Sequence, residues 1–230
     1  YHCSMEIAEN LQSIKEALPS DVELIAVSKT HPIGTIMRAY DAGHRAFGEN
    51  KVQELIAKAP AMPQDIEWHL IGHLQTNKVK YIVDFVYLVH SVDSLKLLKE
   101  INKRAAGKGK CIDCLLQVHI ADETSKFGLN EDEVRLLLNS VDFSSMKNIR
   151  VRGLMGMATF TEDKSQVRNE FTELKAVFES LKEDVASTSN WQPEVVSMGM
   201  SGDYQIAIDA GSNMVRVGSA IFGARNYNAD

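Results

Sequence analysis

Short apolar runs recur along this chain at intervals that each leave room for one helix, and this alternation constrains the fold more than any other feature. The runs have the length of strands, and amphipathic stretches of helical length lie between them. The predicted strands are 23–29, 46–50, 66–72, 85–92, 111–120, 149–157, 195–201 and 214–223, and the predicted helices are 5–18, 33–42, 52–59, 94–106, 131–139 and 165–184. Repeats of this kind form either a closed (β/α)8 barrel or an open, doubly wound sheet.

The number of strands favours the barrel. An open sheet usually carries a G-x-G-x-x-G turn after its first strand, whereas this chain has Lys29-Thr-His-Pro32 at that point. The chain has 230 residues, of which 44% are hydrophobic, and it contains no linker-like tract. We therefore predict a single domain over residues 1–230, a TIM barrel with residues 5–18 as an extra N-terminal helix.

Composition excludes several classes of partner. The formal net charge of −6 and the isoelectric point near 5.7 argue against nucleic acid. No apolar run approaches the roughly 18 residues that span a bilayer, and no secretory signal pattern is present, so we expect no membrane partner and a cytoplasmic location. Three cysteines are too few for a disulfide framework. Cys111 and Cys114 lie in one predicted strand and face opposite sides, which favours core packing over a redox or metal pair.

Lys29 closes the first predicted strand, at the end where barrels collect their chemistry. Burial lowers the pKa of an amine, and the neutral amine condenses with a carbonyl to form a Schiff base. The alternative is that the side chain extends from the strand end into water.

Two turns of small residues follow the seventh and eighth strands, where barrels often bind phosphate. One turn, starting at Ser201, leads into a helical stretch over 204–210, and the other is Gly218-Ser219. Free N–H groups at a helix start bind anions. Either turn alone is a weak signal, but together they predict a phosphate-binding mouth.

Arg216 alternates with Val215 and Val217, so its side chain should point into the barrel. It could pair with an inward carboxylate such as Glu49, or donate to a ligand near the phosphate. A carbonyl-reactive lysine, a phosphate site and an inward arginine together fit pyridoxal 5′-phosphate (PLP). Because arginine keeps its proton, a pyridine nitrogen facing Arg216 stays unprotonated, and a neutral pyridine is a poor electron sink.

Several specific motifs occur in one order along the chain. They are Ala26-Val-Ser-Lys-Thr-His-Pro32, Phe47-Gly-Glu-Asn50, Trp68-His-Leu-Ile-Gly-His-Leu-Gln-Thr-Asn-Lys78, Lys126-Phe-Gly128, Gly153-Leu-Met-Gly-Met157, Ser197-Met-Gly-Met-Ser201 and Val215-Arg-Val-Gly-Ser-Ala-Ile-Phe-Gly223. With these motifs, residues 5–225 resemble the YggS/PROSC-type pyridoxal phosphate homeostasis proteins, which are single-domain relatives of the alanine racemase barrel.

The resemblance implies an α/β barrel of the alanine racemase N-terminal-domain type, the fold type III of PLP proteins. The residues that it assigns to the cofactor are Lys29, Asn50, Met157, Ser201, Arg216, Gly218 and Ser219. Lys29 would carry PLP as a Schiff base, Ser201, Gly218 and Ser219 would hold its phosphate, and Arg216 would face the pyridine nitrogen. The remaining two would line the pocket. Ser219 stands where many relatives have threonine, which keeps the hydroxyl.

Two further features have ordinary explanations. His69 and His73 have H-x3-H spacing, but their segment is predicted as a strand followed by a loop, so we expect no metal. We expect His69 to pack or to hydrogen-bond near the barrel mouth, on the cofactor side. Asp163, Lys164 and the charged stretch 165–184 indicate a solvated helix face.

Three functions fit these residues. The favoured one is a non-catalytic PLP carrier that delivers the cofactor to PLP-dependent apo-enzymes. The alternative is an amino-acid racemase in which Lys29 removes a proton, but racemisation needs a second acid/base group on the opposite face. The resemblance implies that two-domain racemases take it from an additional β domain, and we expect none here because the sequence ends soon after Gly223. A class I aldolase would leave Arg216 without a pyridine. We expect a monomer, because no long apolar stripe remains once the helices pack.

Overall fold

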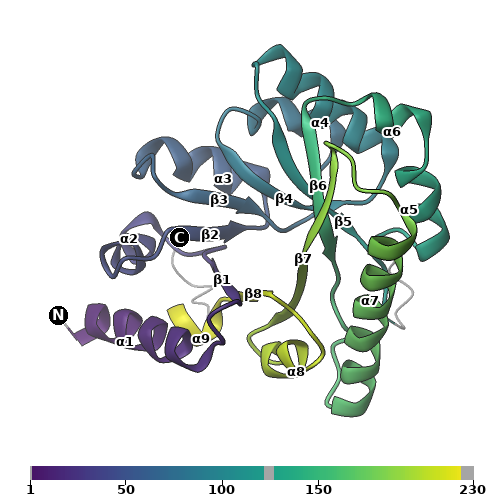
Figure 1. Cartoon of the computed structure of the whole chain (residues 1–230). Coiled ribbons are helices and arrows are strands. Elements are labelled where there is room, and N and C mark those ends of the chain that lie inside the picture. The colour runs from purple at the N-terminus through teal and green to yellow at the C-terminus, as the bar shows by residue number, and fades with distance from the viewer. Residues whose placement is uncertain (1, 122–126, 224–230) are drawn as a thin grey trace.

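The computed structural model describes residues 2–121 and 127–223, with side chains from residue 6 onward (Figure 1). Parallel strands follow one another in sequence order around a closed barrel, and β8 pairs with β1. This confirms the predicted (β/α)8 barrel. The strands are β1 Glu23–Val27, β2 Ala46–Glu49, β3 Glu67–Leu70, β4 Val86–Val92, β5 Ile112–Gln117, β6 Ile149–Met155, β7 Trp191–Met200 and β8 Met214–Val217.

Helices surround the barrel, and α1 lies outside the βα repeat beside α2 and α9, as the extra N-terminal helix (Figure 1). The α-helices are α1 His2–Ala17, α2 Ile33–Asp41, α3 Val52–Lys58, α4 Leu95–Gly107, α5 Glu131–Leu138, α6 Val141–Ser145, α7 Lys164–Asp184, α8 Tyr204–Asp209 and α9 Ser219–Phe222. Two 3-10 helices, η1 Ala59–Ala61 and η2 Thr76–Tyr81, complete the set. Within the described part of the chain, no helix combines the length and apolar character that crossing a membrane requires.

Two apolar layers stabilise the barrel. The inner one fills the space enclosed by the strands with Ile25, Ala46, Leu88, Leu115, Met155 and Met214. The outer one lies between strands and helices and includes Val215 and Val217, whereas Arg216 between them is buried inside. The predicted alternation along β8 is therefore confirmed. Each fully buried aliphatic side chain contributes about 1.5–3 kcal/mol to these layers.

Several strands are shorter than predicted, because apolar residues continue past the point where the backbone leaves the sheet. β1 ends at Val27, two residues before Lys29, and the chain turns there with Thr30 at φ +67°. β8 ends at Val217, and the apolar residues that follow form helix α9. β7 instead begins earlier than predicted, at Trp191, although Pro193 lies within it.

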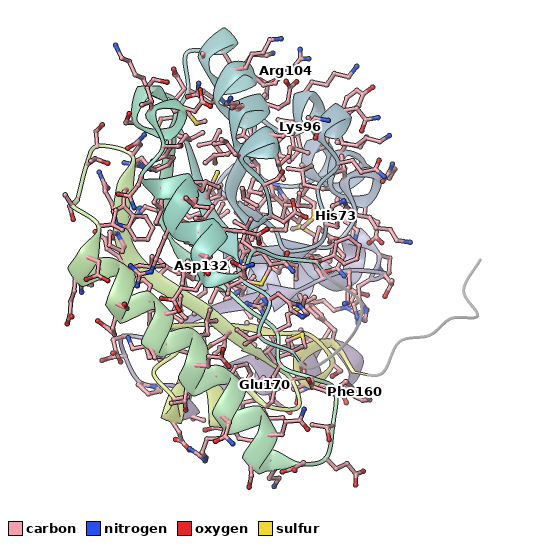
Figure 2. All side chains as sticks on the ribbon, turned by 90° about the vertical axis from the view of Figure 1, so that its right-hand side faces the viewer. His73, Lys96, Arg104, Asp132, Phe160 and Glu170 are labelled. Carbon is pink, nitrogen blue, oxygen red and sulfur yellow. The ribbon has the colours of Figure 1, made fainter. Side chains whose placement is uncertain are left out.

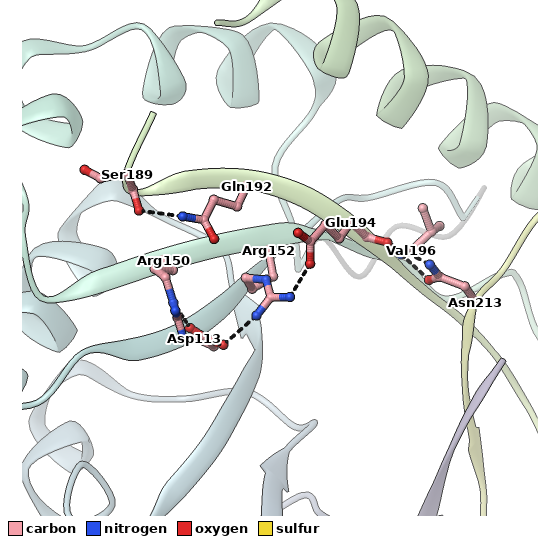
Figure 3. Close-up of polar contacts among 8 residues, drawn as sticks. All are labelled: Asp113, Arg150, Arg152, Ser189, Gln192, Glu194, Val196 and Asn213. Carbon is pink, nitrogen blue, oxygen red and sulfur yellow. Dashed lines mark hydrogen bonds and ion pairs between the residues drawn. The ribbon is translucent and has the colours of Figure 1, made fainter. Parts of the chain in front are cut away.

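The N-terminal mouth of the barrel carries a ladder of ion pairs (Figure 3). Asp113 on β5 accepts from Arg150 at 2.7 Å and from Arg152 at 3.0 Å, and Arg152 also binds Glu194 on β7. The predicted core packing is confirmed for Cys114, which is buried in β5, and is wrong for Cys111, which is exposed just before that strand; both thiols are free.

Candidate functional site

A pocket of about 490 Å³ opens at the C-terminal ends of the strands. Every residue that the sequence assigned to the cofactor lies on its wall, although these residues come from strand ends, loops and a helix start spread over the whole chain. They are Lys29, Asn50, Met157, Ser201, Arg216, Gly218 and Ser219. The fold thus brings together the lysine, the arginine and both small-residue turns.

Lys29 lies in the turn after β1, and its side chain is half-buried in the pocket wall. The turn is fixed from behind, because the Thr30 amide donates to Glu54 Oε2 at 2.8 Å. Left-handed backbone at a non-glycine residue is uncommon and costs free energy, so surrounding contacts must hold it. The lysine of this motif therefore points into a pocket rather than from a strand end into bulk water.

A buried ionic network supports this turn from beneath. Lys58 Nζ donates to Glu49 Oε1 at 2.7 Å, to Glu54 Oε2 at 2.9 Å and to the Ser28 carbonyl at 3.1 Å. The Ser28 hydroxyl also donates to Glu49 Oε1, at 2.7 Å. Burial raises the pKa of Glu49 to about 7, although Lys58 and Ser28 act in the opposite direction.

The two small-residue turns lie together at the pocket. The Gly218 amide donates to Ser201 Oγ at 3.0 Å, which joins the loops after β7 and β8. A Cβ atom at Gly218 would lie 3.1 Å from the Val27 carbonyl oxygen, so a side chain at this position would push the neighbouring backbone away by a few tenths of an ångström. Asp203 Oδ1 accepts from the Met200 amide at 2.6 Å and closes the first turn. The first amides of α8 and α9 have no partner within their own helices.

Arg216 forms the floor of the pocket. It is 3% exposed, and its guanidinium donates to Ser197 Oγ at 2.5 Å and to the Gly156 carbonyl at 3.0 Å. The predicted alternative of an ion pair with Glu49 is wrong, because that carboxylate pairs with Lys58 instead. Burial lowers the pKa of Arg216 to about 10, with the Asp203 charge acting in the opposite direction, so the guanidinium stays protonated at neutral pH.

A chain of buried polar groups runs from Arg216 through the barrel interior. Ser197 Oγ lies 3.0 Å from His90 Nδ1, and His90 Nε2 lies 2.9 Å from His69 Nδ1. Burial lowers the pKa of His69 to about 3, and it lowers the pKa of His90 well below its ordinary value. Both rings are therefore neutral at neutral pH. His69 makes a hydrogen bond, as expected, but it lies beneath the pocket, whose wall is lined instead by Ile71, Gly72 and His73 of the same segment.

Apolar and aromatic side chains form the rim of the pocket. Phe160 is 99% exposed, and Phe127 and Met157 are also exposed. The His73 ring packs on Phe127 with the ring centroids 4.9 Å apart. Glu170 on α7 holds the neighbouring loop by accepting from the Thr159 amide and hydroxyl; Figure 2 labels Glu170 together with Phe160, the residue that follows Thr159. Lys126 of the Lys126-Phe-Gly128 motif falls outside the described residues.

Several pocket residues were not predicted from the sequence. They are Val27, His31, Ile71, Gly72, His73, Gln117, Phe127, Phe160, Met200, Gly202, Asp203 and Gly223. Most of them lie in the quoted motifs or directly beside them, so motif membership was the available signal. Phe160 had no such signal, because it lies in a loop of unremarkable composition.

Comparison with known proteins places this chain among barrels of the alanine racemase N-terminal-domain type. The family model for the alanine racemase N-terminal domain matches residues 4–226. The alanine racemase from E. faecalis shares the fold with a TM-score of 0.75 at 19% identity, over 96% of this chain and 58% of that chain.

Closer relatives define the family within this class. The pyridoxal phosphate homeostasis protein of Vibrio alginolyticus is 40% identical over 217 residues, which are 91% of this chain and 89% of that protein. Its counterpart in Escherichia coli K12 is 34% identical, over 97% of this chain and 98% of that protein. PipY of Synechococcus elongatus PCC7942, solved with PLP bound, has 35% identity and a TM-score of 0.85, over 94% of this chain and 100% of that chain. The chain therefore belongs to the pyridoxal phosphate homeostasis protein family.

Proposed function

We propose that this chain binds PLP in the pocket at the C-terminal ends of its strands and acts in PLP homeostasis. One observation carries the proposal: a half-buried lysine, a buried arginine and two joined small-residue turns line a single pocket. The names of the relatives and the PLP-bound structure of PipY support it.

The residues present fit this cofactor. Lys29 supplies a primary amine for the aldehyde, and Arg216 supplies N–H groups for a pyridine nitrogen, which has a lone pair to accept them. Gly218 lies on the pocket wall, where its amide donates to Ser201 Oγ, so the two turns present their backbone to one ligand group. Pyrophosphate and phosphate sites often use such glycine-lined turns at helix starts.

Each pocket residue has a distinct role in this proposal. Lys29 attaches the cofactor through a Schiff base, in which its nitrogen replaces the aldehyde oxygen and water is released. Ser201, Gly218 and Ser219 hold the phosphate, and Arg216 faces the pyridine nitrogen. The two remaining assigned residues, on the pocket walls, are Asn50 and Met157. When bound, PLP supplies an electron-withdrawing ring, and Arg216 limits that withdrawal because it cannot hand over its proton.

The pocket favours holding the cofactor over racemisation. A racemase needs a second acid/base group opposite the lysine. The described tyrosines are Tyr40, Tyr81, Tyr87 and Tyr204, and none of them lines the pocket. The rim is also open, which leaves a reactive carbanion exposed to water. An amino-acid racemase remains the alternative that activity assays must exclude.

The proposal extends to partners and location. PLP-dependent apo-enzymes receive the cofactor from this protein, which acts as a monomer in the cytoplasm. The strongly exposed apolar side chains among the described residues lie on separate elements, such as Tyr81 on η2, Leu136 on α5 and Phe160 before α7, and scattered residues of this kind do not require a partner. Sedimentation velocity tests the monomer, since a concentration-dependent shift to larger species contradicts it.

Reductive trapping tests the attachment. Borohydride delivers hydride to the carbon of a Schiff base and leaves a stable secondary amine on the modified lysine. After incubation with PLP, reduction and proteolysis, we expect the modification on the peptide that contains Lys29. The Lys51→Ala variant, which removes a nearby exposed lysine, should be labelled to the same extent. Labelling spread over surface lysines, with none at Lys29, contradicts the proposal.

A further inference from the structure

Two carboxylates and an imidazole meet at the N-terminal mouth of the barrel, at the opposite end from the pocket, with Glu23 exposed, Glu67 half-buried and His69 buried. Glu23 and Glu67 are the first residues of β1 and β3, and His69 lies two positions further along β3. One carboxylate oxygen from each glutamate and one ring nitrogen of His69 all lie within 4.8 Å of one another. Residues two apart on a strand face the same side, which is why β3 supplies two of the three groups.

In the described part of the chain, no cation forms an ion pair with either of these two carboxylates. Among the described side chains, neither glutamate has a lysine or arginine nitrogen within 4.0 Å. Arg152 is the nearest influence, but it already pairs with Asp113 and Glu194 (Figure 3). Lys15 and Arg45 line the shallow pocket beside the glutamates, and the guanidinium pairs with Asp65 at 2.7 Å. Two like charges at this separation repel each other unless a cation lies between them.

His69 supplies the second, independent indication of a ligand. The ring is fully buried, and its Nε2 atom has no hydrogen-bond partner among the residues that the structure describes. Its Nδ1 atom lies 2.9 Å from His90 Nε2. With the single proton of the neutral ring on Nδ1 and donated to His90, the lone pair on Nε2 is available. Histidines that bind metals nearly always donate their other N–H to such a partner, so the outer support of a ligand is already in place.

We propose that Glu23, Glu67 and His69 bind a divalent transition-metal ion, with Zn²⁺ as the best match and water completing its shell. Zinc accepts imidazole nitrogen and carboxylate oxygen in sites that hold three protein ligands, whereas Mg²⁺ and Ca²⁺ prefer oxygen alone. The H-x3-H spacing in the sequence pointed to the wrong partner, because His73 lies at the other end of the barrel. The site does not depend on PLP, and it stands or falls separately from the proposed function.

Calorimetric titration with zinc chloride tests the site in the Cys111→Ser background, because the exposed Cys111 thiol lies at the same end of the barrel. We expect one equivalent to bind. Glu67→Gln keeps the side-chain size but removes a charged ligand, and it should weaken binding about tenfold or more. The control Glu194→Gln removes one negative charge at the same mouth, but from a carboxylate that already forms an ion pair with Arg152. It should leave the affinity for zinc within about twofold of the parent protein. Circular dichroism checks that each variant is folded.

X-ray absorption at the zinc edge then identifies the ligands. The proposal predicts nitrogen and oxygen neighbours at about 2.0–2.1 Å, with the outer-shell signature of an imidazole. Three results overturn it: no saturable binding, an affinity that Glu67→Gln leaves unchanged, or sulfur in the first shell. An equal loss in Glu194→Gln and Glu67→Gln also overturns it, because the effect is then one of general charge.

Discussion

Lys58→Met removes the cation that partners the most deeply buried carboxylate of the site. The Glu49 side chain has no exposed surface and that of Lys58 is 10% exposed, with Nζ and Oε1 2.7 Å apart. Methionine keeps the aliphatic length but leaves Glu49 with only Ser28 as a donor. Removing one partner of a buried ion pair typically costs about 3–5 kcal/mol, because the other charge remains desolvated.

The cost should depend on pH in a direction that the pKa of Glu49 determines. Burial raises this pKa from 4.5 to about 7 even with Lys58 in place. When folding raises the pKa of an acid, the contribution of that acid to folding stability is fully present at a pH below its pKa in the unfolded chain. This contribution is lost as the pH rises through its pKa in the folded protein. At pH 5.5 Glu49 is mostly neutral, so the substitution should cost only lost hydrogen bonds, about 1–2 kcal/mol. At pH 8 the wild-type carboxylate is ionised, and the loss should reach about 3–5 kcal/mol.

Urea unfolding followed by circular dichroism at pH 5.5 and pH 8 measures both losses. Lys51→Met is the control, because this lysine is exposed, and it should shift neither midpoint. Adding Glu49→Gln to Lys58→Met removes the buried charge and should recover most of the loss at pH 8. An equal loss at both pH values, or a loss below about 1 kcal/mol at pH 8, refutes the reasoning.

Two further predictions concern the loops of the pocket. Gly218→Ala places a Cβ atom 3.1 Å from a backbone oxygen, so it should lower the free energy of unfolding by about 1–3 kcal/mol and also lower the affinity for PLP. In the control Gly202→Ala, in the adjoining loop, the new Cβ atom meets nothing within 4 Å, so the melting temperature should not change. Equal melting temperatures for the two variants would count against the close approach. Glu170→Gln should weaken the contacts that hold the loop after β6, so the rate of amide hydrogen exchange over residues 157–163 should rise severalfold. The control Glu173→Gln, on the exposed side of α7, should leave this exchange rate unchanged. Unchanged exchange in both variants would show that Glu170 does not hold the loop.

The sequence predicted the barrel and the pocket wall because both depend on local patterns. Alternating strands and helices set the topology, and in a parallel barrel all strand ends of one kind meet at one mouth. Lys29, Ser201 and Gly218, far apart in the chain, therefore had to converge. The inward direction of Arg216 followed from the two-residue period of a strand.

The contacts beneath the pocket could not be predicted in the same way. The chain from Arg216 through Ser197 and His90 to His69 joins four strands at one depth, and strand register across a barrel is not written in any local motif. Register also decided the partner of Glu49, which faces Lys58 from α3 rather than Arg216. The predicted length of β8 was too great for a related reason. The apolar residues after Val217 are buried in helix α9, and a buried apolar residue fits a helix as well as a strand.

The central claim is that Lys29 holds PLP, and the near-ultraviolet and visible absorption spectrum tests it most directly. Wild type, Lys29→Ala and the control Lys51→Ala are each titrated with PLP, and D- and L-alanine are then added to each. The account predicts a Schiff-base band in wild type and control that is missing in Lys29→Ala, with no racemisation of alanine. Turnover that disappears with Lys29→Ala would make the protein an enzyme. An identical band in Lys29→Ala, or no band in any of the three proteins, would contradict the account.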